Sequence, residues 1–239
     1  MIKGILFDKD GTLIEFKNVW HDIIRKILID LGTRYNFSKD IIEKIKEVSG
    51  YKENDFTKES IIQYCATSQI VEIWYNIMKD VRMEEHKEIT CPDLMKLFEE
   101  KSLDEGIKIE ALEGVKDLLI YLKNKNYILG VATADTFAST IFGLKKAELI
   151  SYFDYIGFNE EGVNPKPASD MAVRFCEENH LKPEEILIVG DSVTDMLFAE
   201  NSGANFIGIK TQYNEYEEFS KHNRKSVKRL GDIIREFGL

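Results

Sequence analysis

The length, composition and charge of the chain limit the kinds of protein it can be. With 239 residues, it can form one domain with an insertion or two small domains, and its 44% hydrophobic and 31% charged residues are typical of a globular protein. A net charge of −10 argues against nucleic acids and anionic membranes as partners. An anionic substrate would therefore need local positive charge at its site. No apolar run approaches the roughly 20 residues of a membrane span, and we expect a cytoplasmic protein.

The first predicted element is a buried strand over residues 2–8, within the opening sequence MIKGILFDKDGTLI. It ends in two acidic residues, Asp8 and Asp10, with one residue between them. Residues two apart in a strand point to the same side and lie roughly 6.5–7 Å apart, so both carboxylates should reach into one space. Such a pair can divide nucleophilic attack and proton transfer between two acids. A calcium loop does not fit, because Gly11 is fourth and Val19 twelfth in the motif; an ordinary turn is the alternative.

Residues 15–108 form a block in which only helical patterns occur. Apolar residues at helical spacing predict helices within 19–35 and 69–81, and a shorter helix around 41–45. We find no strand pattern in this block. An all-helical unit is therefore expected to interrupt an α/β domain directly after its first strand.

From residue 114 onward, short apolar runs alternate with amphipathic helical patterns. This alternation predicts an α/β fold with a Rossmann-like open parallel sheet and helices on both sides. We assign residues 1–14 and 109–239 to this core domain and residues 15–108 to an inserted helical cap domain. The predicted strands are 127–133, 153–158, 186–191 and 204–210, and the predicted helices carry apolar stripes within 115–122, 171–176 and 227–237.

A second acidic pair follows the predicted strand 186–191, in the sequence ILIVGDSVTDM. Asp191 ends the strand, and Asp195 comes four residues later, where a helix should begin. Because ligands bind beyond the carboxyl ends of parallel strands, Asp191 can join Asp8 around Mg²⁺, which prefers oxygen ligands. Asp195 would stand behind it and orient a ligand water or Lys166. The alternative is a turn followed by a helix N-cap, a position that also favours Asp and Ser.

A lysine and a threonine are the candidates for binding a phosphoryl group. Lys166 lies between two prolines in the sequence NPKPASD, and the fixed φ of proline pre-sets the path of its loop. Thr133 ends the apolar run YILGVAT, and its hydroxyl, with the backbone N–H of Ala134, could bind a phosphoryl oxygen. The alternatives are a solvated lysine in a rigid turn and a β-branched residue that merely ends a strand.

The order of these motifs resembles that of a known family. DKDGTL, then Thr133, then Lys166, then GDSVTD is similar to the four motifs of the haloacid dehalogenase superfamily. The resemblance is nearest to the phosphoglycolate phosphatase-like branch, in which a helical, C1-type cap is inserted after the first strand. It covers residues 1–14 and 112–210 most directly.

The resemblance implies a role for each acidic residue. Asp8 would be the nucleophile that forms an aspartyl-phosphate. Asp10 would protonate the leaving oxygen and then activate water. Mg²⁺ would be bound by Asp8, by the backbone carbonyl of Asp10 and by Asp191, with Asp195 supporting the metal site from behind.

The resemblance also implies that Thr133 and Lys166 hold the phosphoryl group. The chain departs from the branch here, because Ala134 and Asp135 follow Thr133 where the branch commonly has Asn. None of the departures removes a catalytic group.

The cap contains candidate residues for selecting the substrate. Lys17 lies near the first connection between core and cap, and Tyr51 and Lys52 lie in the predicted loop 50–55 between cap helices. Both tryptophans fall on apolar stripes, so we expect them in the core of the cap. The sequence of the cap does not name the substrate.

We expect a Mg²⁺-dependent phosphatase that acts on a small phosphorylated metabolite, phosphoglycolate-like or a sugar phosphate. Alternatives within the family are a phosphomutase of the β-phosphoglucomutase type, a halide-removing enzyme and a phosphonate-cleaving enzyme. Outside catalysis, the alternatives are a phospho-receiver module, which would lack the helical insertion, and a non-catalytic phosphate-binding regulatory protein. The sequence does not distinguish a monomer from a homodimer.

Overall fold

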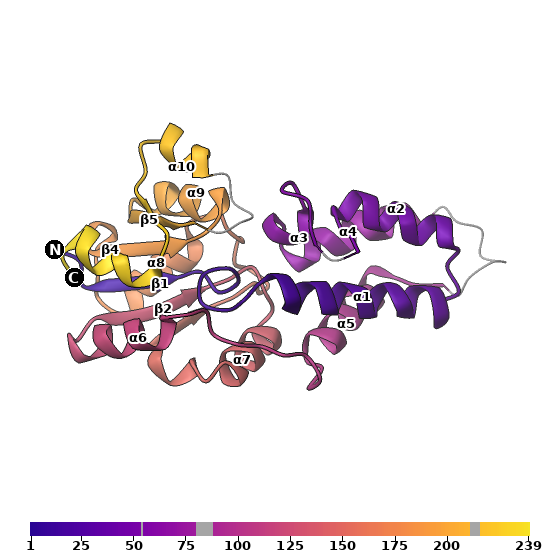
Figure 1. Cartoon of the computed structure of the whole chain (residues 1–239), viewed down its shortest axis with the longest axis horizontal. Helices are drawn as coiled ribbons and strands as arrows, with labels where there is room; N and C mark the ends of the chain where they lie inside the picture. The colour runs from indigo at the N-terminus through magenta and orange to yellow at the C-terminus, as the bar shows by residue number, and fades with distance from the viewer. Residues whose placement is uncertain (54, 80–87, 211–215) are drawn as a thin grey trace. The chain divides into compact units, whose positions relative to one another are not determined.

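The computed structural model describes residues 1–53, 55–79, 88–210 and 216–239. The chain divides into two compact units, which we call the sheet unit (Met1–Glu15 with Ile109–Leu239) and the helical unit (Phe16–Lys108). Figure 1 shows the sheet in the first unit and the helices α1–α5 in the described part of the second. The role of the helical unit as a cap stays a prediction. Within the described residues, no helix is both long and apolar enough to cross a membrane.

The sheet unit contains six parallel strands in the order β3-β2-β1-β4-β5-β6. The predicted α/β fold with an open parallel sheet is therefore confirmed. The chain moves outward in one direction from β1 and, after β3, returns to the other side of β1 to begin β4, so the winding reverses between β1 and β4. Ligands of such sheets bind at this reversal, beyond the carboxyl ends of the strands. The strands are Gly4–Phe7 (β1), Ile128–Ala132 (β2), Tyr155–Gly157 (β3), Ile186–Gly190 (β4), Asn205–Ile209 (β5) and Ser226–Val227 (β6).

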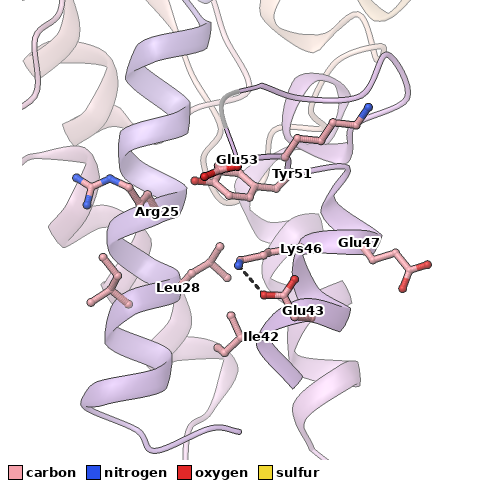
Figure 2. A pocket seen from close by; sticks show the side chains of 10 residues that line it. Arg25, Leu28, Ile42, Glu43, Lys46, Glu47, Tyr51 and Glu53 are labelled. Atoms are coloured by element: carbon pink, nitrogen blue, oxygen red, sulfur yellow. Dashed lines mark hydrogen bonds and ion pairs between the residues drawn. The ribbon is translucent and has the colours of Figure 1, made fainter. Parts of the chain in front are cut away.

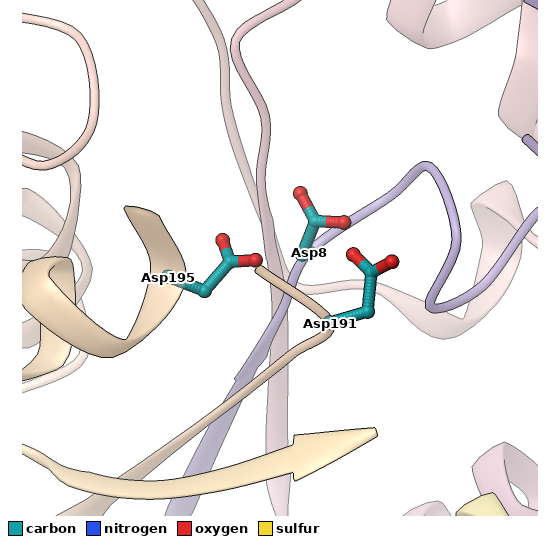
Figure 3. Close-up of side chains that lie close together, drawn as sticks. All are labelled: Asp8, Asp191 and Asp195. Carbon is teal, nitrogen blue, oxygen red and sulfur yellow. The ribbon is translucent and has the colours of Figure 1, made fainter. Parts of the chain in front are cut away.

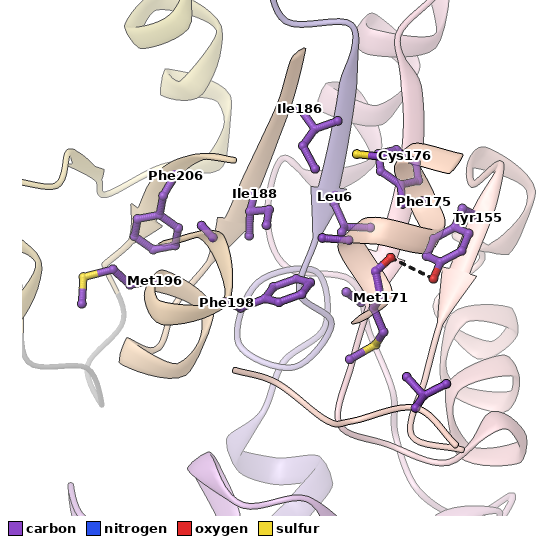
Figure 4. Close-up of a cluster of buried hydrophobic side chains, with 14 of the residues drawn as sticks. Leu6, Tyr155, Met171, Phe175, Cys176, Ile186, Ile188, Met196, Phe198 and Phe206 are labelled. Carbon is purple, nitrogen blue, oxygen red and sulfur yellow. Dashed lines mark hydrogen bonds between the residues drawn. The ribbon is translucent and has the colours of Figure 1, made fainter. Parts of the chain in front are cut away.

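The central strands β1 and β4 are buried along their whole length because helices cover the sheet. Figure 4 shows how Met171, Phe175 and Phe198 gather around Leu6 and Ile188 in one apolar cluster. Burying a side chain of this size stabilises the fold by about 1.5–3 kcal/mol. This packing makes the strand ends a rigid platform. The helices of the unit are Val115–Asn124 (α6), Phe137–Lys146 (α7), Asp170–Glu178 (α8), Val193–Ser202 (α9), Tyr216–Lys221 (α10) and Ile233–Phe237 (α11), with 3-10 turns at Ile150–Tyr152, Pro183–Glu185 and Leu230–Asp232.

In the helical unit, the apolar stripes that the sequence predicts are buried. Trp20, Ile24 and Ile27 of the first helix are buried, as is Trp74 further along the chain. The Trp74 indole N–H donates to Ser49 Oγ at 2.8 Å, so its polar atom is satisfied in the core. Residues 80 and 81 of the predicted helix 69–81 lie outside the described residues. The helices are Lys17–Thr33 (α1), Lys39–Ser49 (α2), Ile61–Tyr64 (α3), Thr67–Met78 (α4) and Cys91–Ser102 (α5).

The C-terminal segment corrects the prediction of one helix over 227–237. Its first residues instead form β6, because β5 offers an unpaired edge: Gly208 N–H donates to Lys225 O at 2.9 Å, and Lys210 N–H donates to Val227 O at 2.8 Å. A 3-10 turn follows, and the helix α11 begins only at Ile233. Pairing with a distant strand overrides the local helical pattern here.

Candidate active site

The first candidate residue, Asp8, lies directly after β1. Its backbone N–H donates to Val189 O of β4 at 2.8 Å, which places it beside the end of that strand. The chain then closes a compact turn, in which the amides of Leu13 and Ile14 both donate to Lys9 O at 2.9 Å. This turn holds Asp8 at the point where the winding of the sheet reverses.

Asp191 follows β4, and Gly11 lets the opening turn approach it. Gly11 has φ of +83°, which favours glycine, and a Cβ placed on it would lie 2.5 Å from Asp191 Oδ2. Any other residue would displace the Asp191 carboxylate or the turn. The turn after β1 and the residue after β4 are therefore in close contact at Gly11.

Asp8, Asp191 and Asp195 bring their carboxylates together. One oxygen from each lies within 4.8 Å of the others, and Figure 3 shows them around a common space. Asp195 belongs to the first turn of α9, where its Oδ2 accepts from the Ser192 amide at 3.1 Å and from the Ser192 hydroxyl at 2.6 Å. Its Oδ1 faces Lys166 instead. Asp195 therefore takes part in the cap of α9 and also contacts Lys166, while its support of a metal from behind stays a prediction.

Lys166 joins two of these acids. Its ammonium donates to Asp8 Oδ1 and to Asp195 Oδ1, both at 2.6 Å, and its side chain is only 5% exposed. Burial by itself lowers the pKa of Lys166, but the carboxylates of Asp195 and Asp8 outweigh it, so the pKa is raised and the amine stays charged. The loop is held from α9, because the Asn201 side-chain amide donates to Pro167 O at 2.8 Å.

The clustered acids outnumber the ammonium group that contacts them. Burial raises the pKa of the Asp8 carboxyl to about 7 despite the lowering effect of Lys166, and Asp195 and Asp10 add to the rise. Burial, followed by the charge of Asp8, raises the pKa of Asp191 well above its usual range. The three clustered acids face one ammonium. A hard divalent cation fits this site, because Asp8 and Asp191 offer oxygen ligands whose repulsion it would offset.

Asp10 is placed differently from its neighbour two residues earlier. Its two carboxylate oxygens lie 2.9 Å and 2.8 Å from Lys9 Nζ, and its side chain is not one of the three clustered carboxylates. It still adds to the negative field at Asp8. Metal binding through its backbone carbonyl stays a prediction.

Sequence reasoning missed the partners of Asp10. Lys9 is buried and also lies 2.9 Å from Asp135 Oδ2, which accepts in turn from the Ser139 hydroxyl at 3.0 Å. A signal was present, since a lysine between two acids at the end of a buried strand needs a carboxylate partner. The sequence does not say which of its many acids that partner is.

The predicted phosphoryl-binding residues follow β2, next to β1 in the sheet. Thr133 is buried, its backbone N–H donates to Gly157 O at 3.1 Å, and its Oγ1 accepts from the Asp135 amide at 3.2 Å. A hydroxyl that accepts one hydrogen bond can still donate its own hydrogen. Ala134 is partly exposed beside it. Their role toward a phosphoryl group stays a prediction.

The sequence pattern of the haloacid dehalogenase-like hydrolase family matches residues 5–209. The chain belongs to this family. The predictions of the family and of a hydrolase are thereby confirmed.

Other haloacid dehalogenase-like proteins match nearly the whole chain. A pyrophosphatase PpaX of Bacillus mycoides is 26% identical and covers 87% of this chain and 83% of its own. A phosphoglycolate phosphatase of Nitrosospira multiformis is 25% identical, with 90% and 86% covered. The crystal structure of CbbY from Rhodobacter sphaeroides in complex with phosphate has a TM-score of 0.71 at 19% identity, with 98% and 96% covered. These names support the predicted phosphatase class, and the likeness to CbbY shows the shared fold.

The predicted selector residues lie within the helical unit of this haloacid dehalogenase-like chain. Tyr51 and Lys52 line a cavity of about 780 Å³ between α1 and α2, shown in Figure 2. The Tyr51 ring stacks on His21 with the centroids 4.7 Å apart. Lys17 is not among the residues that line this cavity, and its ammonium pairs with Asp55 at 3.0 Å. Substrate selection by these residues stays a prediction.

Proposed function

We propose that this protein is a Mg²⁺-dependent phosphatase that hydrolyses a small phosphate monoester through an aspartyl-phosphate on Asp8. The observation that carries the proposal is the Lys166 ammonium at 2.6 Å from both Asp8 and Asp195, with Asp191 in the same cluster. This arrangement supports the proposal, because Asp8 as nucleophile would lie beside the Lys166 ammonium and beside acids that could bind a metal cation. The pyrophosphatase and phosphoglycolate phosphatase names of its relatives support the same class.

Mg²⁺ would be held by the carboxylates of Asp8 and Asp191 and by the backbone carbonyl of Asp10. When bound, it would supply positive charge that screens the phosphate from the acids. Asp195 would support the metal site from behind and not bind the ion directly, because its two oxygens already accept from Lys166 and Ser192. Phosphoryl transfer depends mostly on such positioning and charge neutralisation.

In the first step, an oxygen of Asp8 attacks phosphorus. The bond from phosphorus to the ester oxygen breaks, and Asp10 gives its proton to that leaving oxygen. Lys166 and Thr133, with the Ala134 amide, hold the phosphoryl oxygens. Asp10 is now ionised.

In the second step, Asp10 takes a proton from water as the water oxygen attacks phosphorus. The bond between phosphorus and the Asp8 oxygen breaks, which releases inorganic phosphate and restores the Asp8 carboxylate. Asp10 ends protonated, ready for the next substrate. Two moderate barriers thus replace one high barrier.

The proposal is tested by turnover of p-nitrophenyl phosphate with and without Mg²⁺, followed by a panel that contains phosphoglycolate, sugar phosphates and pyrophosphate. We expect phosphate release that requires the metal, and loss of turnover in Asp8→Asn without loss of fold by circular dichroism. Normal turnover in that variant would contradict the nucleophile. Phosphate retained on an isomeric sugar would indicate a mutase, and no turnover across the panel would favour the regulatory alternative.

A further inference from the structure

A buried lysine contacts Asp10 and also pairs with a second buried acid, and the proposed reaction gives neither of them a role. Lys9 is 4% exposed and Asp135 is 5% exposed. The Lys9 ammonium lies 2.9 Å and 2.8 Å from the two oxygens of Asp10, and 2.9 Å from Asp135 Oδ2. A desolvated ammonium is unfavourable alone, and both acids stabilise it here.

Helix α7 and the segment after β2 enclose this ion cluster. Ser139 of α7 donates to Asp135 Oδ2 at 3.0 Å, and Gly143 lies one turn further along the same face. A Cβ placed on Gly143 would lie 3.8 Å from Lys9 Nζ, so the helix backbone itself packs against the ammonium. The Asp135 amide is also tied, donating to Thr133 Oγ1 at 3.2 Å. Lys9 is therefore anchored to a part of the chain more than a hundred residues away.

The charge of Lys9 is secured by this setting. Burial by itself lowers the pKa of Lys9, but Asp10 and Asp135 outweigh it, so the pKa is raised. The contact of the ammonium with both Asp10 oxygens limits rotation of that carboxylate.

We propose that Lys9, anchored by Asp135 and Ser139, is a positioning residue that fixes the Asp10 carboxylate for proton transfer. The inference rests on the proposed function, because only that function makes Asp10 the acid and then the base. A reacting group misplaced by about 1 Å can lose about 10²-fold in rate, so anchoring of this kind matters most in steps that use Asp10.

The two steps of the reaction depend on Asp10 unequally when the substrate is p-nitrophenyl phosphate. Its leaving group departs as p-nitrophenolate without a proton, so the first step does not need the acid, and Asp10 loses its proton to solvent before the second step. The second step still needs the base that takes a proton from water. Loosening Asp10 should therefore slow release of phosphate from Asp8 and leave its formation nearly unchanged.

The test variant is Lys9→Met/Asp135→Asn, which removes both charges together. Lys9→Met alone would leave Asp135 buried and unpaired, and so could unfold the protein. The matched control is Lys116→Met/Glu148→Gln, which removes an ion pair of the same kind that is exposed on the same unit. If the double variant fails to fold by circular dichroism, Asp135→Asn alone keeps Lys9 paired with Asp10 and weakens only the anchor.

We expect kcat for p-nitrophenyl phosphate to fall by about 10–100-fold in the test variant while kcat/KM stays within about threefold. A rapid burst of p-nitrophenolate, approaching one per enzyme, should precede the slow phase. Asp135→Asn alone should give the same burst with about a tenfold fall in kcat. The control should match the wild type in all three quantities.

A double-mutant cycle separates positioning from an independent role. Added to Asp10→Asn, the Lys9→Met/Asp135→Asn change should cause no further loss of kcat, because its effect passes through Asp10. A multiplied loss, a fall in kcat/KM without a burst, or an unchanged kcat would each overturn the positioning role. Absence of wild-type turnover, or turnover retained in Asp8→Asn, would instead overturn the proposed function, and the positioning role with it.

Discussion

Single residues that follow two strands bring the acidic cluster of the candidate site together. Asp8 after β1 and Asp191 after β4 could be predicted from sequence, because each ends an apolar run and parallel strands deliver such residues to one edge. Lys166 could be predicted as well, from its place between two prolines. The contact from Lys9 to Asp135 could not, since no local pattern links residues that far apart.

The carboxylates differ in what they contribute to metal binding. Asp191→Asn should weaken Mg²⁺ binding by more than about tenfold, because it removes a charged ligand from the cluster. Asp10→Asn should leave the affinity nearly unchanged, since its side chain faces Lys9. Titrating Mg²⁺ against the melting temperature measures both without any substrate. Equal weakening in the two variants would contradict this division.

At the scale of elements, pairing between distant segments decides what local patterns leave open. The five longer strands follow from apolar runs in the sequence. The segment that forms β6 is predicted as part of a helix, and it becomes a strand because it pairs with the outer edge of β5. The turn after β1 shows the same dependence. Its path is compatible with Asp191 because Gly11 has no side chain.

Gly11→Ala tests that contact between elements. Its φ of +83° and the 2.5 Å approach to Asp191 Oδ2 predict a destabilisation of about 1–3 kcal/mol and weaker Mg²⁺ binding. Gly231→Ala is the matched control, because a Cβ there meets nothing within 4 Å. Urea unfolding compares the two variants. Equal stability in both would show that the turn can move away from Asp191.

At the scale of the whole molecule, a net charge of −10 makes local cations decisive for an anionic substrate. The sequence predicts that a helical unit interrupts the sheet unit. It does not predict the cavity that Tyr51 and Lys52 line, because side chains from two helices and a loop form that cavity together. Neither the sequence nor the cavity names the substrate.

Lys52→Ala tests whether this cavity takes part in selection. If it binds an anionic group of the substrate, kcat/KM for phosphoglycolate should fall by about two- to fivefold, the effect of one exposed charge, relative to p-nitrophenyl phosphate. Lys39→Ala is the control, since Lys39 is exposed on the same unit and does not line the cavity. An identical ratio in both variants would remove Lys52 from the selecting residues.

In the proposed reaction, Asp8 carries the phosphoryl group during turnover. The most direct measurement is acid quenching of the working enzyme with p-nitrophenyl phosphate, followed by peptide mass spectrometry, in the wild type and in Asp10→Asn. We expect one phosphoryl group on Asp8, enriched in Asp10→Asn because the second step is slowed, and none in Asp8→Asn. A phosphoryl group on any other residue, or rapid turnover with none on Asp8 in either protein, would contradict it.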